Sequence, residues 1–360
     1  MLNRLSIPIM QGPMLGVSNE ALVLAVSNAG GLGCLAASNL APEALGHRIQ
    51  VLRAATDRPF LINLFIQAPA EPDAEDVQRA IERLAPWRER FNLPAQSAPR
   101  IWAESFADQF DVLVQSAPPA ASFTFGCLTR EQVAALQAQG TWVMGTATTV
   151  AEARAWADVG ADAVCAQGFE AGGHRGTFLR DVSESLVGTL SLVSTIRAAV
   201  DLPVVAAGGI TDGKAVAAVL TLGAAAAVVG TAYLMADEAS TSAPWKNAIA
   251  TVGDDATRLT RVFSGRTARG IENTFMRDMR GVEAEIPAYP IQNALTQELR
   301  AAAAKAGDAE VLSLWAGQSV ALAKAGSARA ITHTLWRDAQ ATIAATHALW
   351  GKASIPQTET

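Results

Sequence analysis

Short apolar runs, each bounded by glycine or proline, recur eight times in the first 230 residues. The runs are 7–10, 31–36, 59–65, 121–125, 141–146, 163–167, 203–207 and 226–230. They do not alternate polar with apolar positions, and an unbroken apolar run is typical of a strand buried on both faces of a parallel sheet. The pattern therefore predicts eight buried, parallel strands.

Segments with helical spacing of apolar residues separate these runs. They are 19–28, 42–56, 129–139, 150–159, 186–200 and 212–222. Several have Thr, Asn or Asp near the expected N-cap and glycine near the end. Eight strand-helix units in about 235 residues match a closed barrel, whereas a doubly wound sheet usually stops at five to seven strands. We therefore predict the α/β class and a (β/α)8 TIM barrel.

Two stretches depart from the repeat. Residues 66–120 carry proline-rich and charged sequence and are expected to form one or two outer helices packed on the barrel. After residue 235 an irregular stretch at 260–293 precedes Ala-rich helical segments. These predicted helices are 294–306, 308–325 and 329–350. They indicate a smaller, mainly helical cap domain near the C-terminus, over the barrel mouth where active sites of this fold lie.

The predicted division of the chain has three parts. Residues 1–240 form the barrel, 241–335 form the cap or substrate domain, and 336–360 form a C-terminal helix and tail, for which packing on the barrel is one option. Half of the residues are hydrophobic and only 17% are charged, which is typical of a folded enzyme and excludes a disordered chain.

Charge and targeting signals limit the partners. The net charge is −6 and Lys and Arg never cluster beyond a pair, so we expect no nucleic-acid partner. The N-terminus lacks a cleavable apolar stretch and the apolar run 215–230 is too short to span a bilayer, so we expect no membrane partner and a cytoplasmic location. Cys34, Cys127 and Cys165 lack the spacing of disulfides or metal sites, and no metal is predicted.

The loop after the sixth predicted strand carries the strongest candidate for catalysis. Residues 167–176 read QGFEAGGHRG. Glycines let backbone approach a ligand closely, so this strand end would deliver the Gln167 amide and His174 into the barrel mouth. An imidazole titrates near neutrality, which makes His174 the candidate catalytic residue. The alternative is a histidine that only hydrogen-bonds its own loop.

Two glycine turns follow the seventh and eighth predicted strands. Gly208 and Gly209 end one strand, and Val229-Gly230-Thr231 ends the other. In this fold, amides after these two strands bind a phosphate at the start of a short helix without any cationic side chain. The turns are therefore a candidate phosphate site that suits an acidic chain, with plain tight turns as the alternative.

Two further positions suit a flat ligand. Pro13, Met14 and Leu15 follow the first strand, and a flexible apolar residue such as Met14 could lie along a heteroaromatic ring, although an ordinary turn explains them as well. Asn63 is a polar residue inside an apolar strand. A buried amide needs hydrogen-bond partners, and the edge of a ligand ring is one such partner.

Eight segments carry a resemblance to a known family. They are IPIMQGPM (7–14), FTFG (123–126), DAVCAQGFEAGGHRG (162–176), PVVAAGGI (203–210), VGTAYL (229–234), FSGRTARGIENTFM (263–276), YPIQN (289–293) and LWAGQ (314–318). Occurring in this order along the whole chain, they resemble the signatures of class I nitronate monooxygenases, formerly called 2-nitropropane dioxygenases. The last three are specific to the bacterial and fungal enzymes of that class.

The resemblance implies an FMN-containing barrel that uses O2 to oxidise alkyl nitronates, notably propionate 3-nitronate, to carbonyl compounds and nitrite. It implies FMN contacts at Pro13, Met14, Leu15, Asn63, Gln167, Gly172, Gly209, Val228, Val229, Gly230 and Thr231. His174 matches the family's active-site histidine. The family often has Gln at Val228 and Pro at Leu128; the first departure removes a side-chain contact, and the second is expected to reshape the substrate pocket.

The expected chemistry follows from the substrate's charge. A nitronate is already deprotonated, so His174 is expected to hold the nitro oxygens by a hydrogen bond and to act as a base only for a neutral nitroalkane. Phe125 and Tyr289 are candidate substrate-pocket residues, whereas Lys214 is a weaker candidate that suits a solvated surface. The expected partners are a small nitronate and O2, and the sequence predicts no oligomeric state.

Two other functions stay open. One is an NAD(P)H-dependent flavin reductase of the enoyl-acyl-carrier-protein reductase type, which shares the glycine-flanked histidine loop. The other is a flavin- or phosphate-binding module without turnover, as would arise if the cap blocked the mouth. Bleaching of bound flavin by NADH would favour the first, and bound flavin without nitrite release from any nitronate would favour the second.

Overall fold

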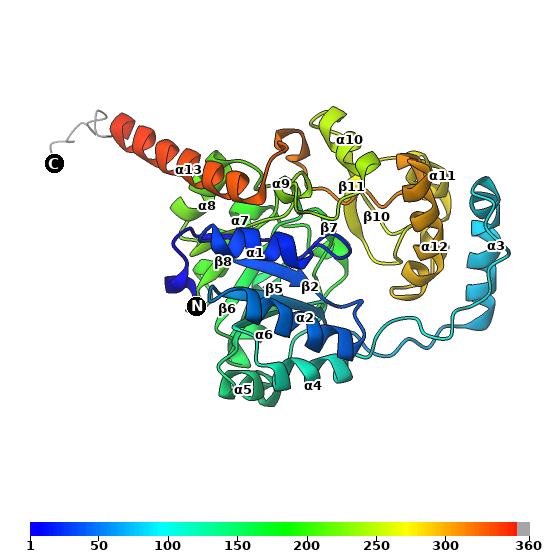
Figure 1. Cartoon of the computed structure of the whole chain (residues 1–360), viewed down its shortest axis with the longest axis horizontal. Coiled ribbons are helices and arrows are strands. Elements are labelled where there is room, and N and C mark those ends of the chain that lie inside the picture. Colours follow the sequence, from blue (N-terminus) through cyan, green and yellow to red (C-terminus); the bar gives the residue numbers. More distant parts are fainter. Residues whose placement is uncertain (351–360) are drawn as a thin grey trace, which may run out of the picture.

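Eight parallel strands form the sheet of the barrel in the computed structural model, which describes residues 1–350 (Figure 1). They are β1 (Ile9–Gln11), β2 (Gly33–Ala36), β3 (Phe60–Phe65), β4 (Ala120–Thr124), β5 (Trp142–Ala147), β6 (Ala163–Gln167), β8 (Val204–Ala207) and β9 (Ala226–Val229). The order runs from β1 through β9, β8, β6, β5, β4 and β3 to β2, and a parallel bridge between Met10 and Leu32 closes the ring. The predicted TIM barrel is confirmed, with every predicted strand present.

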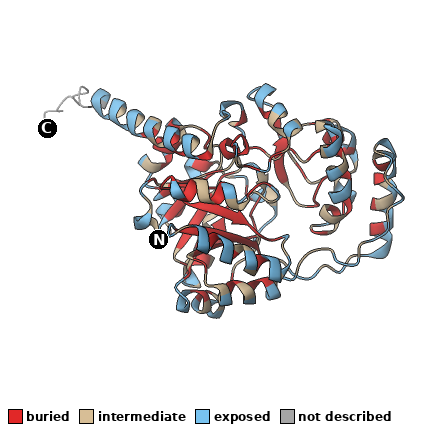
Figure 2. Ribbon diagram, in the orientation of Figure 1, coloured by how far each residue is buried: buried red, intermediate tan, exposed pale blue. Residues whose placement is uncertain are grey.

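Helices cover the outside of the strands. They are α1 (Glu20–Asn28), α2 (Pro42–Ala55), α5 (Arg130–Ala138), α6 (Val150–Asp158), α7 (Thr189–Arg197) and α8 (Gly213–Thr221). Asn19, Thr129, Thr149 and Asp212 each accept a hydrogen bond from a first-turn amide, which satisfies a donor that the helix itself leaves unpaired. Burial is concentrated in the strands and in the helix faces turned toward them (Figure 2).

The insertion between β3 and β4 forms two helices that pack on different partners. They are α3 (Ala74–Arg90) and α4 (Phe106–Ser116). Helix α4 packs against α2, as predicted for an outer helix of the barrel. The prediction is wrong for α3, which packs against the cap helix α12 (Ile291–Ala306) at the edge of the molecule (Figure 1). The ring centroid of Trp87 in α3 lies 4.9 Å from that of Phe275, and Arg88 forms an ion pair with Glu298 at 2.6 Å.

The cap contains a small sheet that the sequence did not predict. Strands β10 (Thr257–Thr260) and β11 (Ala268–Ile271) are antiparallel, and the two-residue β7 (Gly173–His174), from the barrel loop, pairs with β11. After the barrel strands the chain also forms the helices α9 (Thr231–Leu234), α10 (Ala243–Thr251) and α11 (Thr274–Met279). Short 3-10 turns lie at 2–4, 182–184, 280–285, 309–311 and 320–322 of the chain.

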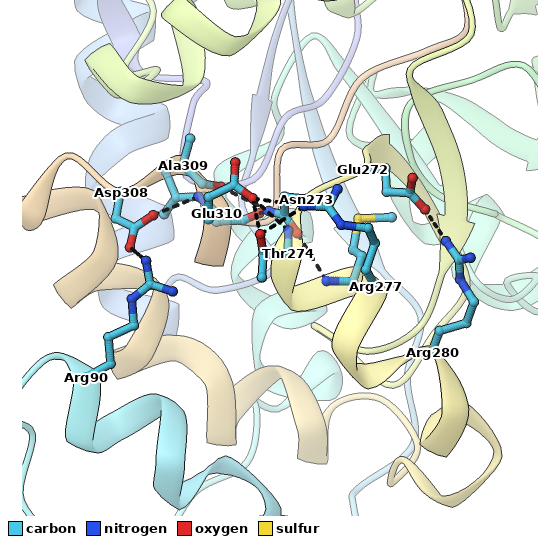
Figure 3. Close-up of polar contacts among 11 residues, drawn as sticks. Arg90, Glu272, Asn273, Thr274, Arg277, Arg280, Asp308, Ala309 and Glu310 are labelled. Carbon is cyan, nitrogen blue, oxygen red and sulfur yellow. Dashed lines mark hydrogen bonds and ion pairs between the residues drawn. The ribbon is translucent and has the colours of Figure 1, made fainter.

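The predicted helix at 308–325 is wrong, because the polar groups of this segment pair with neighbouring elements. The Asn273 side chain donates to Ala309 O at 3.0 Å and Leu312 O at 2.8 Å, and Glu310 accepts from the Thr274 amide at 2.8 Å (Figure 3). Asp308 also pairs with Arg90 of α3 in this view. Farther on, Ile271 N donates to Leu314 O at 2.9 Å and Trp315 bridges to Gly270, so the middle of the segment, between its two 3-10 turns, runs beside β11.

The last described helix is α13 (Ala328–Trp350), which packs against α8 and α1 of the barrel (Figure 1). This helix continues without a break through residue 336, where the predicted C-terminal part begins. Strand β7 also joins a barrel loop to the cap sheet. The three-part division of the chain stays a prediction, and its final residues, 351–360, lie outside the described part. No helix within residues 1–350 is long and apolar enough to cross a membrane.

Candidate active site

A cavity of about 560 Å³ lies at the carboxyl ends of the barrel strands, under the cap. The predicted site residues that line it are Pro13, Met14, Leu15, Asn63, Gln167, Gly172, His174, Gly209, Val228, Gly230 and Thr231. Val229, the last residue of β9, does not line the cavity, because its side chain packs in the hydrophobic core. Leu128 is buried among the outer helices and Lys214 is exposed, so neither reaches the cavity wall.

Main-chain pairing and the Gln167 amide together fix the backbone of His174. His174 pairs with Ala268 across β7 and β11, so the barrel loop is held by the cap sheet. The side chain of Gln167 donates to His174 O at 3.1 Å and accepts from Gly176 N at 2.7 Å. Gln167 therefore holds the loop in place as well as lining the cavity.

The imidazole of His174 has one hydrogen-bond partner among the described residues. Its Nε2 lies 2.8 Å from Ser264 Oγ, and that hydroxyl donates its proton to Arg266 O at 3.0 Å. Because a serine has a single proton, a hydroxyl that donates to Arg266 O accepts its bond from the Nε2 atom. The structure thus favours the neutral Nε2–H tautomer of His174, which leaves the Nδ1 lone pair available.

The environment of His174 disfavours its charged form. Burial lowers its pKa to about 3, and the nearby guanidinium groups of Arg266 and Arg300 add to the effect. At neutral pH the ring is therefore uncharged. A base with so low a pKa has little driving force for taking a proton from carbon.

Aromatic rings surround His174. Phe125 and Tyr289 each place their ring centroid 5.6 Å from that of His174, and Trp315 lies at 5.7 Å. Phe125 and Tyr289 do not line the cavity directly, but both pack against Phe65, which does. Tyr289 meets the Phe65 ring edge-on, whereas the Phe125 ring is tilted by 38° against it. Phe125 also has φ of 77°, a costly left-handed conformation for a bulky residue. The two predicted substrate-pocket residues thus form the wall behind the histidine.

The loop that follows His174 is anchored by a buried carboxylate. Glu152 of α6 accepts from Thr148 N at 2.7 Å, Thr177 Oγ1 at 2.9 Å and Leu179 N at 3.1 Å, and it also accepts from Phe178 N. Burial alone would raise its pKa, but these hydrogen bonds outweigh burial and hold the pKa below its usual value. Glu152 therefore stays ionised and fixes residues 177–179.

The two glycine turns present unused backbone donors to the cavity. Within the described chain, the amides of Gly209 and Gly230 donate to no backbone acceptor. Gly209 has φ of 68°, a conformation that glycine adopts without strain, and a side chain at Gly230 would point into open space. Gly230 also precedes the short helix α9, as expected for a phosphate site at the barrel mouth.

Asn63 supplies an unused acceptor on the same cavity. Its Nδ2 donates to Ser122 Oγ at 3.0 Å, but its buried Oδ1 has no partner in the described part of the chain. Such a buried acceptor is costly unless a ligand or water donates to it. Among residues 1–350, no group of three or more His, Cys, Asp or Glu side chains is arranged to hold a metal ion.

The family model for nitronate monooxygenase matches residues 2–338. The chain belongs to the nitronate monooxygenase family. A probable nitronate monooxygenase from Staphylococcus saprophyticus is 40% identical over 334 residues, which cover 92% of this chain and 94% of that protein. The predicted family is confirmed, and with it the assignment of the chain as an enzyme.

Two solved structures resemble the whole fold. A nitroalkane oxidase from Streptomyces ansochromogenes has a TM-score of 0.88 and 41% identity, covering 96% of this chain and 99% of that one. FabK from Thermotoga maritima has a TM-score of 0.75 and 27% identity, covering 97% of each chain. The nitroalkane oxidase is the more similar of the two in both sequence and fold.

The sequence did not single out three residues of this site. Ser264 lies within the FSGRTARG segment, which could have drawn attention to it. Glu152 reads as an ordinary acidic residue in the first turn of a helix, and Arg300 as a surface residue of an Ala-rich helix. Only the fold brings these side chains to the His174 loop and the cavity.

Proposed function

We propose that this protein is an FMN-dependent enzyme that oxidises alkyl nitronates with O2 to a carbonyl compound and nitrite. The observation that carries the proposal is a single cavity lined by free amides at Gly209 and Gly230 and by a neutral His174. The free amides suit an anionic phosphate, and a neutral His174 suits a substrate that needs no strong base. Membership of the nitronate monooxygenase family supports the same reaction.

The residues around the cavity fit FMN. Gly209, Gly230 and Thr231 would bind its phosphate through main-chain amides, and the unpaired Oδ1 of Asn63 would accept from a ring N–H. Pro13, Met14 and Leu15 would lie beside the ring, because they line the same cavity from the end of β1. Bound there, FMN would supply the two-electron oxidation and the reaction with O2.

The state of His174 favours a nitronate over a neutral nitroalkane. Its Nδ1 atom can accept a proton, but a pKa of about 3 makes it a weak base. A nitronate has no such proton to lose, so the low pKa does not slow its reaction. With Nε2–H bonded to Ser264, His174 presents an acceptor to the substrate, which differs from our expectation that it donates to the nitro oxygens.

Spectroscopy of the purified protein tests the function directly. We expect the spectrum of an oxidised flavin, identified as FMN after its release, and anaerobic bleaching by propionate 3-nitronate but not by NADH. Readmission of O2 should restore the spectrum and yield nitrite. Rapid bleaching by NADH would instead favour the flavin reductase, and bound flavin without nitrite from any nitronate would favour a binding module.

Removing the Ser264 hydroxyl should disturb the tautomer of His174. In Ser264→Ala we expect nitroalkane turnover to fall about 3- to 10-fold, the usual effect of one hydrogen bond, with a smaller change for the nitronate. Long-range proton–nitrogen NMR should show a mixture of both His174 tautomers in the variant and Nε2–H alone in the parent. Ser264→Thr, which keeps a hydroxyl, is the matched control, and an unchanged tautomer in Ser264→Ala would contradict the assignment.

A further inference from the structure

Arg300 of α12 lines the cavity without a carboxylate partner. None of the ion pairs among the described residues includes it. Its Nε donates to Thr296 Oγ1 at 3.2 Å, and its Nη2 donates to Asn293 O at 2.9 Å and Asn293 Oδ1 at 3.0 Å. These bonds to its own helix fix the direction of the side chain.

One end of the guanidinium is poorly satisfied. Nη1 has only Ser313 Oγ as a partner in the described chain, at 3.5 Å, which is the outer limit of a hydrogen bond. Ser313 also lines the cavity. Burial lowers the pKa of Arg300 to about 10, so the group remains charged at neutral pH in a site that solvates it poorly. An anion in the cavity would relieve that cost.

Three other arginines near the His174 loop, all wholly or partly buried, differ from Arg300. Arg175 donates to the carbonyls of residues 148, 167 and 185, Arg266 to those of 175 and 177, and Arg269 to that of 169. These three do not line the cavity, and they hold loop backbone together. Among the four, Arg300 alone faces the space in which a substrate would bind.

We infer that Arg300 binds a planar, two-oxygen anion of the substrate. A guanidinium matches such a group because two parallel N–H donors meet two oxygens. The inference rests on the proposed function for the identity of that substrate. The anion is either the nitronate itself or a carboxylate elsewhere in the same molecule, since the two groups have the same shape and charge.

Three substrates separate these sources in an Arg300→Met variant. If Arg300 binds the nitronate, KM should rise about 10- to 100-fold for both ethyl nitronate and propionate 3-nitronate, the range expected for one hydrogen-bonded charge, whereas KM for neutral nitroethane should stay within about 3-fold. If it binds a carboxylate, only propionate 3-nitronate should lose affinity. An equal loss with nitroethane, or no loss with either anion, would overturn the inference.

Two further variants control for folding and for charge. Arg300→Lys keeps a cation at this place and should recover part of the affinity for the anions, which a purely structural role would not require. Lys305→Met removes a positive charge from an exposed position of the same helix, away from the cavity, and should leave every KM unchanged. Failure of the lysine variant to exceed Arg300→Met in affinity for either anion would also contradict the role of charge.

A non-reacting anion separates this inference from the proposed function. Propionate is a planar two-oxygen anion, and saturation-transfer NMR detects its weak binding without turnover. Binding to the parent protein that is lost in Arg300→Met would support the inference even if no nitronate released nitrite. Equal binding to both proteins, or none to the parent, would overturn it, whatever the outcome of the nitrite assay.

Discussion

Replacing His174 with alanine is expected to reduce nitroalkane turnover by about 100-fold, the lower end of the range for a general base because its pKa is low, while nitronate turnover stays within about tenfold of the parent. In the reaction that we propose, the Nδ1 lone pair of His174 accepts the proton of a neutral nitroalkane, and a nitronate has no such proton to transfer. Measuring kcat/KM separately for nitroethane and ethyl nitronate, each freshly prepared, checks this difference. Equal losses with both substrates would contradict a role as base.

The pH dependence gives a second test of His174. Because its pKa is lowered to about 3, the ring remains neutral from pH 5 upward and should not limit nitroalkane turnover there. The parent enzyme should therefore show no ionisation near pH 6.5 that His174→Ala abolishes. His47→Ala, at an exposed position of α2, is the matched control and should leave both activities unchanged. A change in nitroalkane turnover near pH 6.5 that His174→Ala abolishes would contradict the lowered pKa and would show that the ring is solvated.

Much of the barrel could be predicted because its signals are local. Each strand is an apolar run between breakers, and helix starts such as those at Thr129 and Asp212 are set by capping residues adjacent in sequence. The glycine turns at Gly209 and Gly230 were predictable for the same reason, since position after a barrel strand already places them at the mouth. Periodicity was enough to locate this part of the candidate site.

The cap could not be predicted in the same way, because its structure depends on contacts between distant segments. The Ala- and Leu-rich run at 308–325 has helical composition, but its carbonyls accept from Asn273 and Ile271. Pairing between β7 and β11 joins residues about 95 positions apart. Neither strand is long enough to show the alternation of polar and apolar residues that marks a strand in the sequence. Tertiary hydrogen bonding overrides composition in both cases.

The polar partners of His174 were hidden for a related reason. Ser264 and Arg300 come from the cap, and a single serine or arginine carries no sign of the loop it will meet. The sequence therefore identified the histidine and its glycine neighbours but not the groups that set its tautomer and its pKa. Those groups decide which ring nitrogen carries the proton, which explains why the sequence alone led to the expectation that His174 donates to the nitro oxygens.

Replacing Glu152 with glutamine should destabilise the protein by about 3 kcal/mol and reduce nitrite release roughly 10- to 100-fold. Both carboxylate oxygens of Glu152 accept from donors, so an amide would turn its own N–H groups toward the hydroxyls and amides of Thr148 or of residues 177–179. The loop that follows His174 would lose its anchor. Urea unfolding measures the stability, and nitrite release from ethyl nitronate under saturating FMN measures the activity.

The effect of Glu152 should disappear in acid. Its pKa is lower in the folded protein than in the unfolded chain, so it stabilises the fold above about pH 4.3, the ordinary value for glutamate, and this stabilisation is lost as the pH falls through the lowered value. Parent and Glu152→Gln should therefore differ most near neutrality and converge at low pH. Glu131→Gln removes an exposed carboxylate from the first turn of another barrel helix, α5, and should cost little. A difference that persists unchanged in acid would mean that the side chain acts through its shape, because only an ionised carboxylate can accept all of these hydrogen bonds.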